Sequence, residues 1–309
     1  MIGTITVNPS IDQLILVRGL VKDDANRAVS VLYYPGGKGI NVSKVIRELG
    51  GTAHAFALLG GKSGELLKEL LQKLNTPLTA VAVKGGTRIN TIITDLKDGT
   101  QTRISSLGPV IRRSEMDEFK RRVLSWRPKP FVWALGGSLS WKMDASVYRR
   151  LVWAIQKRGT PCVLDTDGEA LKQGIESKPF LIKPNEYEIG RLVGKSLSAI
   201  GDYLEAGRGL VRKGVKTVVI SLGARGALFV SERQSFHVSV PQVAVKSKVG
   251  AGDSLIGGLV LALSRGKHLE EAARLGMAAS VSAVMRESPR LCLRRDIPML
   301  LPRIKVRAL

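Results

Sequence analysis

Val249-Gly250-Ala251-Gly252-Asp253-Ser254-Leu255 is the most informative stretch of this 309-residue sequence. It follows an apolar run over 236–245, and it opens a segment whose apolar residues recur at helical spacing. The pattern predicts a strand, a glycine-rich turn and then a helix, with Asp253 near the N-cap. The unpaired N–H groups of such a helix start, together with the helix dipole, can bind an oxyanion or a phosphoryl group.

Asp253 has two interpretations at this point. A carboxylate beside a phosphoryl-binding turn can accept the proton of an attacking hydroxyl. An N-capping aspartate on an ordinary tight turn would have the same local sequence, because aspartate is a preferred N-cap residue. The stretch alone leaves both interpretations open, so the remainder of the chain has to decide between them.

The composition describes a chain that can bury one large domain, with room for a smaller appendage. We find no apolar run that would span a bilayer and no charged-then-apolar leader. Cys162 and Cys292 are far apart in sequence and lack metal-ligand spacing. We therefore expect a reduced, cytoplasmic protein without a membrane partner.

The charge balance is strongly basic, with 48 Lys and Arg against 26 Asp and Glu, a net charge of +22 and a pI near 10.3. Such an excess attracts phosphates, including those of nucleic acid. The cations follow helical patterns, however, and no arginine-rich tail or aromatic-interleaved RNA motif occurs. We interpret most of the excess as solvated surface and expect no specific nucleic-acid partner.

Strands and helices alternate along most of the chain. The expected strands are 2–7, 55–59, 131–135, 162–165, 180–183 and 218–222, with a hairpin at 226–240. The expected helices cover about 42–49, 64–74, 114–125, 144–158, 198–213, 253–265 and 269–286. This alternation predicts a mostly parallel sheet covered by helices on both faces, a three-layer α/β/α class.

Two β-rich segments, 10–33 and 88–107, interrupt this pattern, and Asp98-Gly99 is a hairpin signal within the second. We expect them to pair as a small separate sheet that serves as a lid. The main domain would then consist of 1–9, 34–87 and 108–309.

Four further features lie at strand ends or glycine turns, where open α/β sheets bind ligands. Gly36 to Gly39, with Lys38, starts a helix, and Asp12 follows the first strand. Asn185 and Glu188 are three residues apart after a strand, so they either hold Mg²⁺ or form a capping box. Ser221 to Gly226 is either a nucleotide-phosphate turn or the entry to a hairpin.

Five motifs occur in one order along the chain: Asn8-Pro9-Ser10-Ile11-Asp12, Gly36-Gly37-Lys38-Gly39-Ile40-Asn41-Val42, Lys183-Pro184-Asn185-x-x-Glu188, Ser221-Leu222-Gly223-Ala224-x-Gly226 and Val249-Gly250-Ala251-Gly252-Asp253. Together they resemble the signatures of the PfkB family of carbohydrate kinases, which has the ribokinase-like fold. The resemblance covers nearly the whole chain. Five motifs in order favour a catalytic Asp253 over a simple cap.

Two more segments, Asp23-Asp24-x-Asn26-Arg27 and Thr87-Arg88-Ile89-Asn90, look like the phosphohexose branch of that family. That branch includes 1-phosphofructokinase, tagatose-6-phosphate kinase and the minor 6-phosphofructokinase. The resemblance implies that Lys38, Arg27 and Arg88 surround the phosphate already on the sugar, and arginine offers forked donors for such a dianion. The alternative for the two arginines is an ordinary solvated charge on a β-ribbon.

The resemblance also implies the remaining roles in an Mg²⁺- and ATP-dependent phosphoryl transfer. The implied catalytic residues are Asp253, as base, with Gly250, Ala251 and Gly252 around the transferred group. Those implied for the acceptor are Asp12, Arg27, Gly36, Gly37, Lys38, Gly39, Asn41, Arg88, Arg103 and Ser138. Those implied for the nucleotide are Lys183, Asn185, Ser221, Leu222, Gly223, Ala224, Arg225 and Gly226, and those implied for the metal ion are Asn185 and Glu188.

Fructose 1-phosphate is the first expected acceptor, and fructose 6-phosphate or tagatose 6-phosphate is the alternative. A neutral-sugar or nucleoside kinase of the same fold and a non-catalytic, basic nucleic-acid-binding protein are rival hypotheses. The resemblance further implies a homodimer joined through the lid. Ser140-Trp141-Lys142 replaces the usual Pro-Pro-Gly, which puts substrate fit there in doubt, and Arg286-Glu287-Ser288 departs from the usual monovalent-cation loop, so activation by K⁺ is left open.

Overall fold

The central strands form because short apolar runs can be buried on both faces of a parallel sheet. Every residue of β1 (Ile2–Thr6), β8 (Trp133–Gly136) and β9 (Cys162–Asp165) is buried in the computed structural model, which describes residues 1–309. The same ten-stranded sheet contains β4 (Ala53–Leu59), β5 (Leu78–Ala82), β10 (Leu181–Ile182), β11 (Thr217–Ser221), β12 (Ala227–Ser231), β13 (Ser235–Ser239) and β14 (Lys305–Ala308). The spatial order is β14-β13-β12-β11-β10-β9-β8-β1-β4-β5, parallel from β11 to β5 and antiparallel from β11 to β14.

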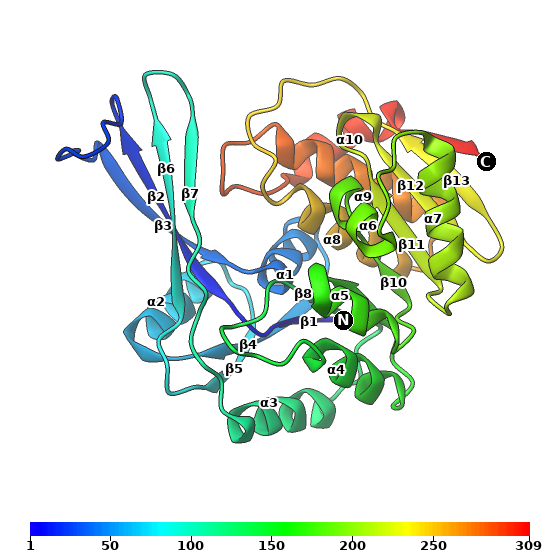
Figure 1. The fold of residues 1–309 in the computed structure, drawn as a ribbon, viewed down its shortest axis with the longest axis horizontal. Helices are drawn as coiled ribbons and strands as arrows, with labels where there is room; N and C mark the ends of the chain where they lie inside the picture. Colours follow the sequence, from blue (N-terminus) through cyan, green and yellow to red (C-terminus); the bar gives the residue numbers. More distant parts are fainter.

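Helices cover both faces of this sheet (Figure 1). One core cluster packs beneath α1 (Lys38–Glu48), α8 (Ala251–Ser264) and α9 (Leu269–Val284). A second cluster lies on the opposite face, beneath α3 (Arg113–Ser125), α4 (Val147–Gln156), α5 (Gly168–Ile175), α6 (Glu186–Val193) and α7 (Ile200–Arg212). The remaining helices are α2 (Gly61–Lys73) and the short α10 (Ile297–Leu300). The expected three-layer α/β/α architecture is confirmed.

Helix α8 is held by unusually close packing against α9. A Cβ atom on Gly258 of α8 would meet Leu275 O at 2.9 Å and Gly276 Cα at 3.0 Å, so only glycine fits at this crossing. Every residue of α8 from Asp253 to Ala262 is buried. The N-terminus of α8 is therefore fixed against the core, and it lies at the carboxyl edge of the parallel strands.

A second, four-stranded sheet stands apart from the first one, and its strands project to one side of the molecule (Figure 1). Its order is β3 (Ser30–Gly36), β2 (Ser10–Val17), β6 (Arg88–Asp95) and β7 (Gln101–Ile104). The two β-rich segments of the sequence meet through β2 and β6, which pair in parallel from Ser10 with Arg88 to Val17 with Asp95. The register matters for the site, because it places Asp12 opposite Asn90.

Several expected boundaries were wrong, each for a local reason. The apolar run over 236–245 is a strand only as far as Ser239, because Pro241 has no N–H to donate to a sheet and an irregular segment follows. The helix expected over 269–286 ends at Val284, and the one expected over 144–158 begins at Val147. The sequence patterns missed β5, α5, α6 as a full helix, and β14. These are short elements whose burial depends on neighbours distant in sequence.

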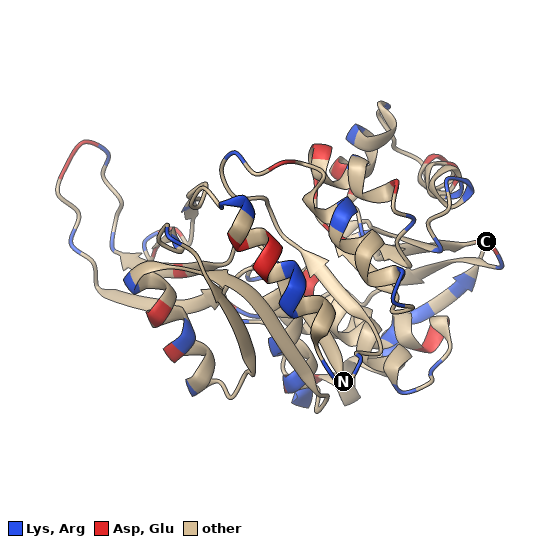
Figure 2. Ribbon diagram, turned by 90° about the horizontal axis from the view of Figure 1, so that it is seen from below, with Lys and Arg blue, Asp and Glu red and all other residues tan.

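None of the helices combines the length and the hydropathy that a membrane span requires. Cys162 and Cys292 are both free and buried. In the view of Figure 2, Lys and Arg are spread over many helices and loops instead of being gathered on one element. Several of them are paired with acids, as Arg121 and Arg122 are with Glu118. This distribution agrees with the interpretation of the excess charge as solvated surface.

Candidate active site

The glycine turn at the start of α8 has the geometry of an anion site. Gly250 is the N-cap residue and adopts a left-handed conformation with φ of 77°, which favours glycine. Gly252 leaves room for the ammonium of Lys183, because a Cβ there would lie 3.0 Å from Lys183 Nζ and would push it aside. The first N–H groups of α8 have no partner within the helix, and residues 250–253 line a large cavity. The sequence pattern predicted Asp253 near the N-cap; it is the third residue of the helix, three positions after the N-cap residue Gly250.

Asp253 does not cap its helix. Its Oδ2 accepts a hydrogen bond of 2.8 Å from Asn41 Nδ2 on α1, and no side-chain cap bond occurs at the start of α8. Burial raises the pKa of Asp253 to about 6, and the nearby Asp165 carboxylate acts in the same direction. A buried carboxylate with a pKa near neutrality, at the edge of a cavity, has the properties of a general base. The geometry therefore favours the catalytic interpretation over the capping one.

Two lysines and one buried aspartate lie beside this carboxylate. Asp165, the last residue of β9, has its Oδ1 3.0 Å from Lys38 Nζ and 3.6 Å from Lys183 Nζ. Burial opposes ionisation of Asp165, but Lys183 and Lys38 outweigh it and hold the pKa of this carboxyl below its ordinary value. Burial likewise opposes the charge of Lys38, whose pKa is nonetheless raised by Asp165, Asp253 and Glu188. No sequence motif marks Asp165, although its place at a strand's carboxyl end matches that of Asp12.

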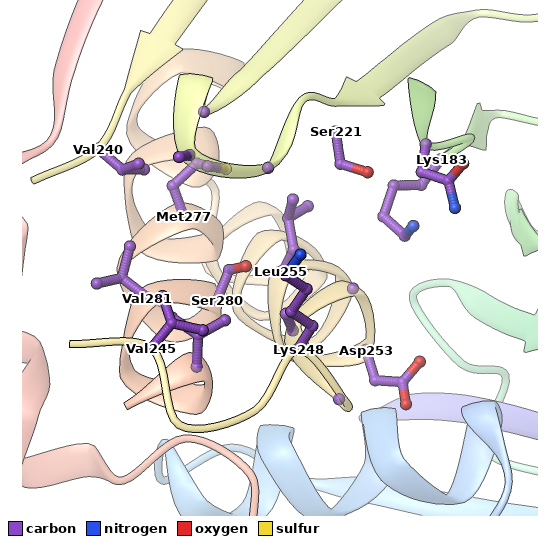
Figure 3. A pocket seen from close by; sticks show the side chains of 18 of the residues that line it. Lys183, Ser221, Val240, Val245, Lys248, Asp253, Leu255, Met277, Ser280 and Val281 are labelled. Atoms are coloured by element: carbon purple, nitrogen blue, oxygen red, sulfur yellow. The ribbon is translucent and has the colours of Figure 1, made fainter. Parts of the chain in front are cut away.

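A cavity of about 980 Å³ opens from this charged group. Its far end is apolar and is lined by Val240, Val243, Val245, Met277 and Val281. Figure 3 shows Asp253 and Lys183 at one end, with Val240 and Val281 at the other. A planar apolar group could occupy the second end while anionic groups extend toward the first. This apolar wall was not predictable from the sequence motifs, because it consists of an irregular segment and one face of α9 that no motif marks.

A second polar group lies where the two sheets meet. Asp12 Oδ1 accepts hydrogen bonds of 2.9 Å from Asn90 Nδ2 and from Ser10 Oγ. Gly36 lets the adjacent backbone approach, because a Cβ there would meet Asp12 Oδ2 at 2.5 Å. Asn41, on the first turns of α1, connects this region with Asp253. The Gly36–Val42 motif thus contacts the Asn8–Asp12 motif through Gly36 and the Val249–Asp253 motif through Asn41.

Arg88 and Ser138 are brought together through Asn8. The Arg88 guanidinium donates to the carbonyl oxygens of Asn8 and Ser106, and Asn8 Nδ2 lies 3.5 Å from Ser138 Oγ. Burial lowers the pKa of Arg88, and the Asp12 carboxylate opposes that effect. Arg88 is thus a cation close to Asp12, as a substrate-binding residue at this position would be.

Two other expected substrate residues do not join this group within one chain. Arg27 lies on the exposed loop between β2 and β3, and Arg103 is on the edge strand β7, where its guanidinium donates to Gln101. Neither is hydrogen-bonded to the Asp12 group. A cluster of Lys38, Arg27 and Arg88 around one phosphate is therefore not formed within this chain, because β2 and β3, which the Arg27 loop connects, extend away from the main sheet (Figure 1).

The chain matches the family model of the pfkB family carbohydrate kinases over residues 2–296. It belongs to the pfkB family of carbohydrate kinases. Membership makes this chain a sugar kinase, a phosphotransferase with an alcohol group as acceptor, and implies ATP as the phosphoryl donor.

Relatives of known name span the whole chain. It is 34% identical over 306 residues to 1-phosphofructokinase of Bacillus subtilis, covering 99% of each chain. It is 34% identical over 297 residues to ATP-dependent 6-phosphofructokinase isozyme 2 of Escherichia coli, covering 96% of each. The structure of phosphofructokinase-2 from Escherichia coli in complex with potassium superposes with a TM-score of 0.94 at 34% identity, over 97% of this chain and 98% of that one. Ribokinase from Thermotoga maritima, 23% identical, shares the fold with a TM-score of 0.77 over 98% and 99% of the two chains.

The Ser221 to Gly226 loop of this pfkB kinase contributes only part of its side chains to the cavity. Ser221, Gly223, Ala224 and Gly226 line it. Leu222 is buried in the core, and the Arg225 guanidinium pairs with Glu186 and donates to Ser198 O. The side chains of Leu222 and Arg225 therefore do not line the cavity, so the structure does not place them where they would contact a nucleotide there. Arg225 instead anchors the loop to α6.

Asn185 and Glu188 form the capping box that the sequence allowed. Asn185 Oδ1 accepts from Glu188 N, and Glu188 Oε2 accepts from Asn185 N, both at 2.8 Å. The two residues also line the cavity, so capping and ligand binding are compatible. No group of three His, Cys, Asp or Glu side chains is arranged to hold a metal ion. A metal ion here would thus need ligands from a bound molecule or water.

The two departures from the family pattern have structural counterparts. Arg286 pairs with the buried carboxylate of Asp296, which also accepts a hydrogen bond of 2.5 Å from Ser282 Oγ. A guanidinium therefore occupies part of the region that would correspond to the family's monovalent-cation loop. Ser140 is buried, whereas Trp141 is exposed beside the groove that contains Arg88 and Ser106.

Proposed function

We propose that this pfkB kinase transfers the γ-phosphoryl group of ATP to a hydroxyl of a hexose phosphate, with fructose 1-phosphate as the first candidate acceptor. One observation carries the proposal: Asp253 is buried at the N-terminus of α8, between a nucleotide-sized cavity and the polar group around Asp12. Relatives named for the phosphorylation of fructose phosphates, at 31–34% identity over nearly the whole chain, support it.

The proton is handled by Asp253. Its carboxylate accepts the proton of the acceptor hydroxyl as that oxygen forms its bond to the γ-phosphorus and the bond to the ADP oxygen breaks. The N–H groups of Ala251, Gly252 and Asp253 face the charge that develops on the transferred oxygens. Because phosphoryl transfer depends on positioning and charge stabilisation, these groups suffice without a covalent nucleophile.

The acceptor lies between the two sheets in this proposal. Asp12 accepts hydrogen bonds from sugar hydroxyls, while Lys38 and Arg88 provide cations for the sugar phosphate. Gly36, Gly37 and Gly39 let the start of α1 pack closely against Asp12, Thr6 and Ile5, which holds Lys38 beside the sugar. Asn41 and Ser138 are at the border of the sugar site. The second sheet, residues 10–33 and 88–107, is proposed to act as a lid over the main domain, which would limit ATP hydrolysis by water.

The nucleotide occupies the 980 Å³ cavity in this proposal. Its adenine lies against the apolar wall of Val240, Val245 and Val281, and its phosphates extend to Lys183 and the N-terminus of α8. Glu188 and Asn185 fit Mg²⁺ through water, because Glu188 Oε1 is outside the capping bonds and Asn185 Oδ1 has a second lone pair to accept from a water molecule. Mg²⁺ would neutralise charge on the ATP phosphates.

The proposed assembly is a homodimer joined through the second sheets. Several apolar side chains of that sheet are exposed, among them Val31, Leu32, Tyr33 and Ile104. A partner sheet that covered them would also bring its β2–β3 loop, with Arg27, toward a neighbouring site. This gives Arg27 a role that the single chain does not provide.

The experiment is a substrate panel. With Mg·ATP, kcat/KM is measured on fructose 1-phosphate, fructose 6-phosphate, tagatose 6-phosphate, the two unphosphorylated sugars fructose and tagatose, and a nucleoside, and ADP release is followed. We expect each phosphorylated sugar that reacts to exceed its unphosphorylated counterpart by about 100-fold or more, since one charge-assisted contact is worth about 1.5–3 kcal/mol and the phosphate makes more than one. Preference for a neutral sugar or nucleoside would refute the acceptor class.

A further inference from the structure

Lys44 has no part in the sequence motifs, yet it extends into the site. It lies on α1, one turn after Asn41, and residues three apart share one face of a helix. Its Nζ donates to Pro35 O at 3.1 Å and lies 3.4 Å from Asn41 Oδ1. The ammonium therefore contacts both a strand of the second sheet and the amide that binds Asp253.

The amide of Asn41 has one acceptor end and one donor end, and only Nδ2 can donate to a carboxylate. In the structure Oδ1 faces Lys44 and Nδ2 faces Asp253 Oδ2. A cation on the Oδ1 side stabilises this orientation over the reversed one, which would set Oδ1 against the carboxylate. Lys44 thus acts on Asp253 through Asn41.

The charges around Lys44 agree with this geometry. Burial lowers the pKa of Lys44 to about 8, while Asp12 and Asp253, on two other elements, act to raise it. The charged groups facing Asp253 are Asp165, Lys38 and Lys183. Lys44 is therefore a partly desolvated cation whose nearest anionic neighbours are the proposed base and the proposed sugar-binding aspartate.

We propose that Lys44 is a positioning residue for phosphoryl transfer: through Asn41 it orients the Asp253 carboxylate and leaves one oxygen free for the acceptor hydroxyl. Through Pro35 O it also ties this arrangement to β3 of the second sheet. The inference rests on the proposed kinase function, and it assigns to Lys44 an effect on turnover greater than its effect on ATP binding.

The test compares the wild-type enzyme with Lys44→Met, Lys44→Cys and Arg47→Met. Arg47 is the matched control, because it is a long cation one turn further along the same helix. We expect Lys44→Met to lower kcat about tenfold or more, with KM for ATP within about twofold of wild type. The acid limb of its kcat/KM profile should also move up by about one pH unit, because a cation near Asp253 is lost. The acceptor phosphate titrates identically with both enzymes, so such a shift belongs to the protein.

Chemical rescue distinguishes loss of the Lys44 ammonium from a general disturbance of the structure by the substitution. Lys44→Cys treated with 2-bromoethylamine regains an ammonium of nearly the original length, while Cys162 and Cys292 are buried with raised pKa values and should not react. We expect alkylation to restore most of the lost kcat and the wild-type acid limb.

The outcomes separate the two proposals. A wild-type kcat and pH profile in Lys44→Met, or a loss of kcat without a shift of the acid limb and without rescue, would overturn the role of Lys44 while the kinase function stands. If the wild-type enzyme phosphorylates no sugar of the panel, the proposed function fails, and this inference fails with it.

Discussion

At the scale of single residues, the site depends on a few polar side chains whose neighbours change their chemistry. Asp253 is the clearest case: it occupies a helix start, where aspartate commonly caps, but its carboxylate bonds to Asn41 on another helix. Burial then raises its pKa to about 6. The same residue type at an exposed helix start would be a solvated anion, so the reactivity comes from the surroundings.

Replacing Asp253 with asparagine tests the base directly. Asn is nearly isosteric but cannot accept the acceptor's proton, so kcat should fall about 100-fold or more. The melting temperature and the Kd for ATP should stay close to wild type, and Asp117→Asn on the exposed face of α3 serves as the control. Turnover within about threefold of wild type would exclude Asp253 as the base.

The pH dependence follows from the same carboxylate. Asp253 must be ionised to accept a proton, and because burial raises its pKa to about 6, kcat/KM should decline as the pH falls below that value. Measurement from pH 5 to pH 8 at constant ionic strength defines the limb. The sugar phosphate also loses a proton in this range, with a second pKa of about 6. The residual activity of Asp253→Asn therefore provides the reference, and an unchanged limb in that variant would assign the titration to the substrate.

At the scale of elements, the position of the N–H groups at the start of α8 depends on how α8 packs against its neighbours. The glycine contact between α8 and α9 sets the helix position, and the left-handed Gly250 sets its first turn. The two β-rich segments form a sheet because β2 pairs with β6 in parallel across more than seventy residues of sequence. That register is also what places Asn90 against Asp12.

A matched pair of glycine substitutions tests the helix contact. Gly258→Ala should lower the free energy of unfolding by about 1–3 kcal/mol, because the added Cβ would overlap the backbone of α9. Gly201→Ala, on α7, has no atom within 4 Å of the new Cβ and should be neutral or stabilising by up to about 1 kcal/mol. Urea unfolding of both variants measures the difference. Equal stabilities would show that the helix crossing tolerates a wider spacing.

At the scale of the whole molecule, the second sheet exposes an apolar surface that the first sheet does not cover. Val31 and Tyr33 are two residues apart on β3 and therefore lie on the same face of the strand. Their side chains are 41% and 42% exposed. Apolar surface gathered on a projecting sheet is typical of an interface between protein chains. The proposed dimer would cover it and would bring Arg27 of one chain toward the other chain's site.

Charge on this surface should break the dimer. We expect Val31→Asp to shift the sedimentation coefficient from that of a dimer to that of a monomer, with KM for the hexose phosphate raised and the fold retained. Met299→Asp adds the same charge at an exposed position far along the chain, on α10, and should leave the assembly unchanged. A wild-type enzyme that sediments as a monomer would contradict the proposed assembly.

By itself, the sequence determined the three-layer class, the pairing of the two β-rich segments and the residues of the glycine turn, because periodicity and glycine placement are local properties. Motif resemblance, confirmed by the family match, led to the kinase. Only the tertiary structure decided that Asp253 bonds to Asn41, that Asp165 joins Lys38 and Lys183, and that apolar side chains line one end of the large cavity beside Asp253. The tertiary structure also shows that Arg27 and Arg103 do not join Lys38 and Arg88, and that Arg225 pairs with Glu186. Those contacts join residues tens to hundreds of positions apart, and burial and charge at such distances follow from the folded chain alone.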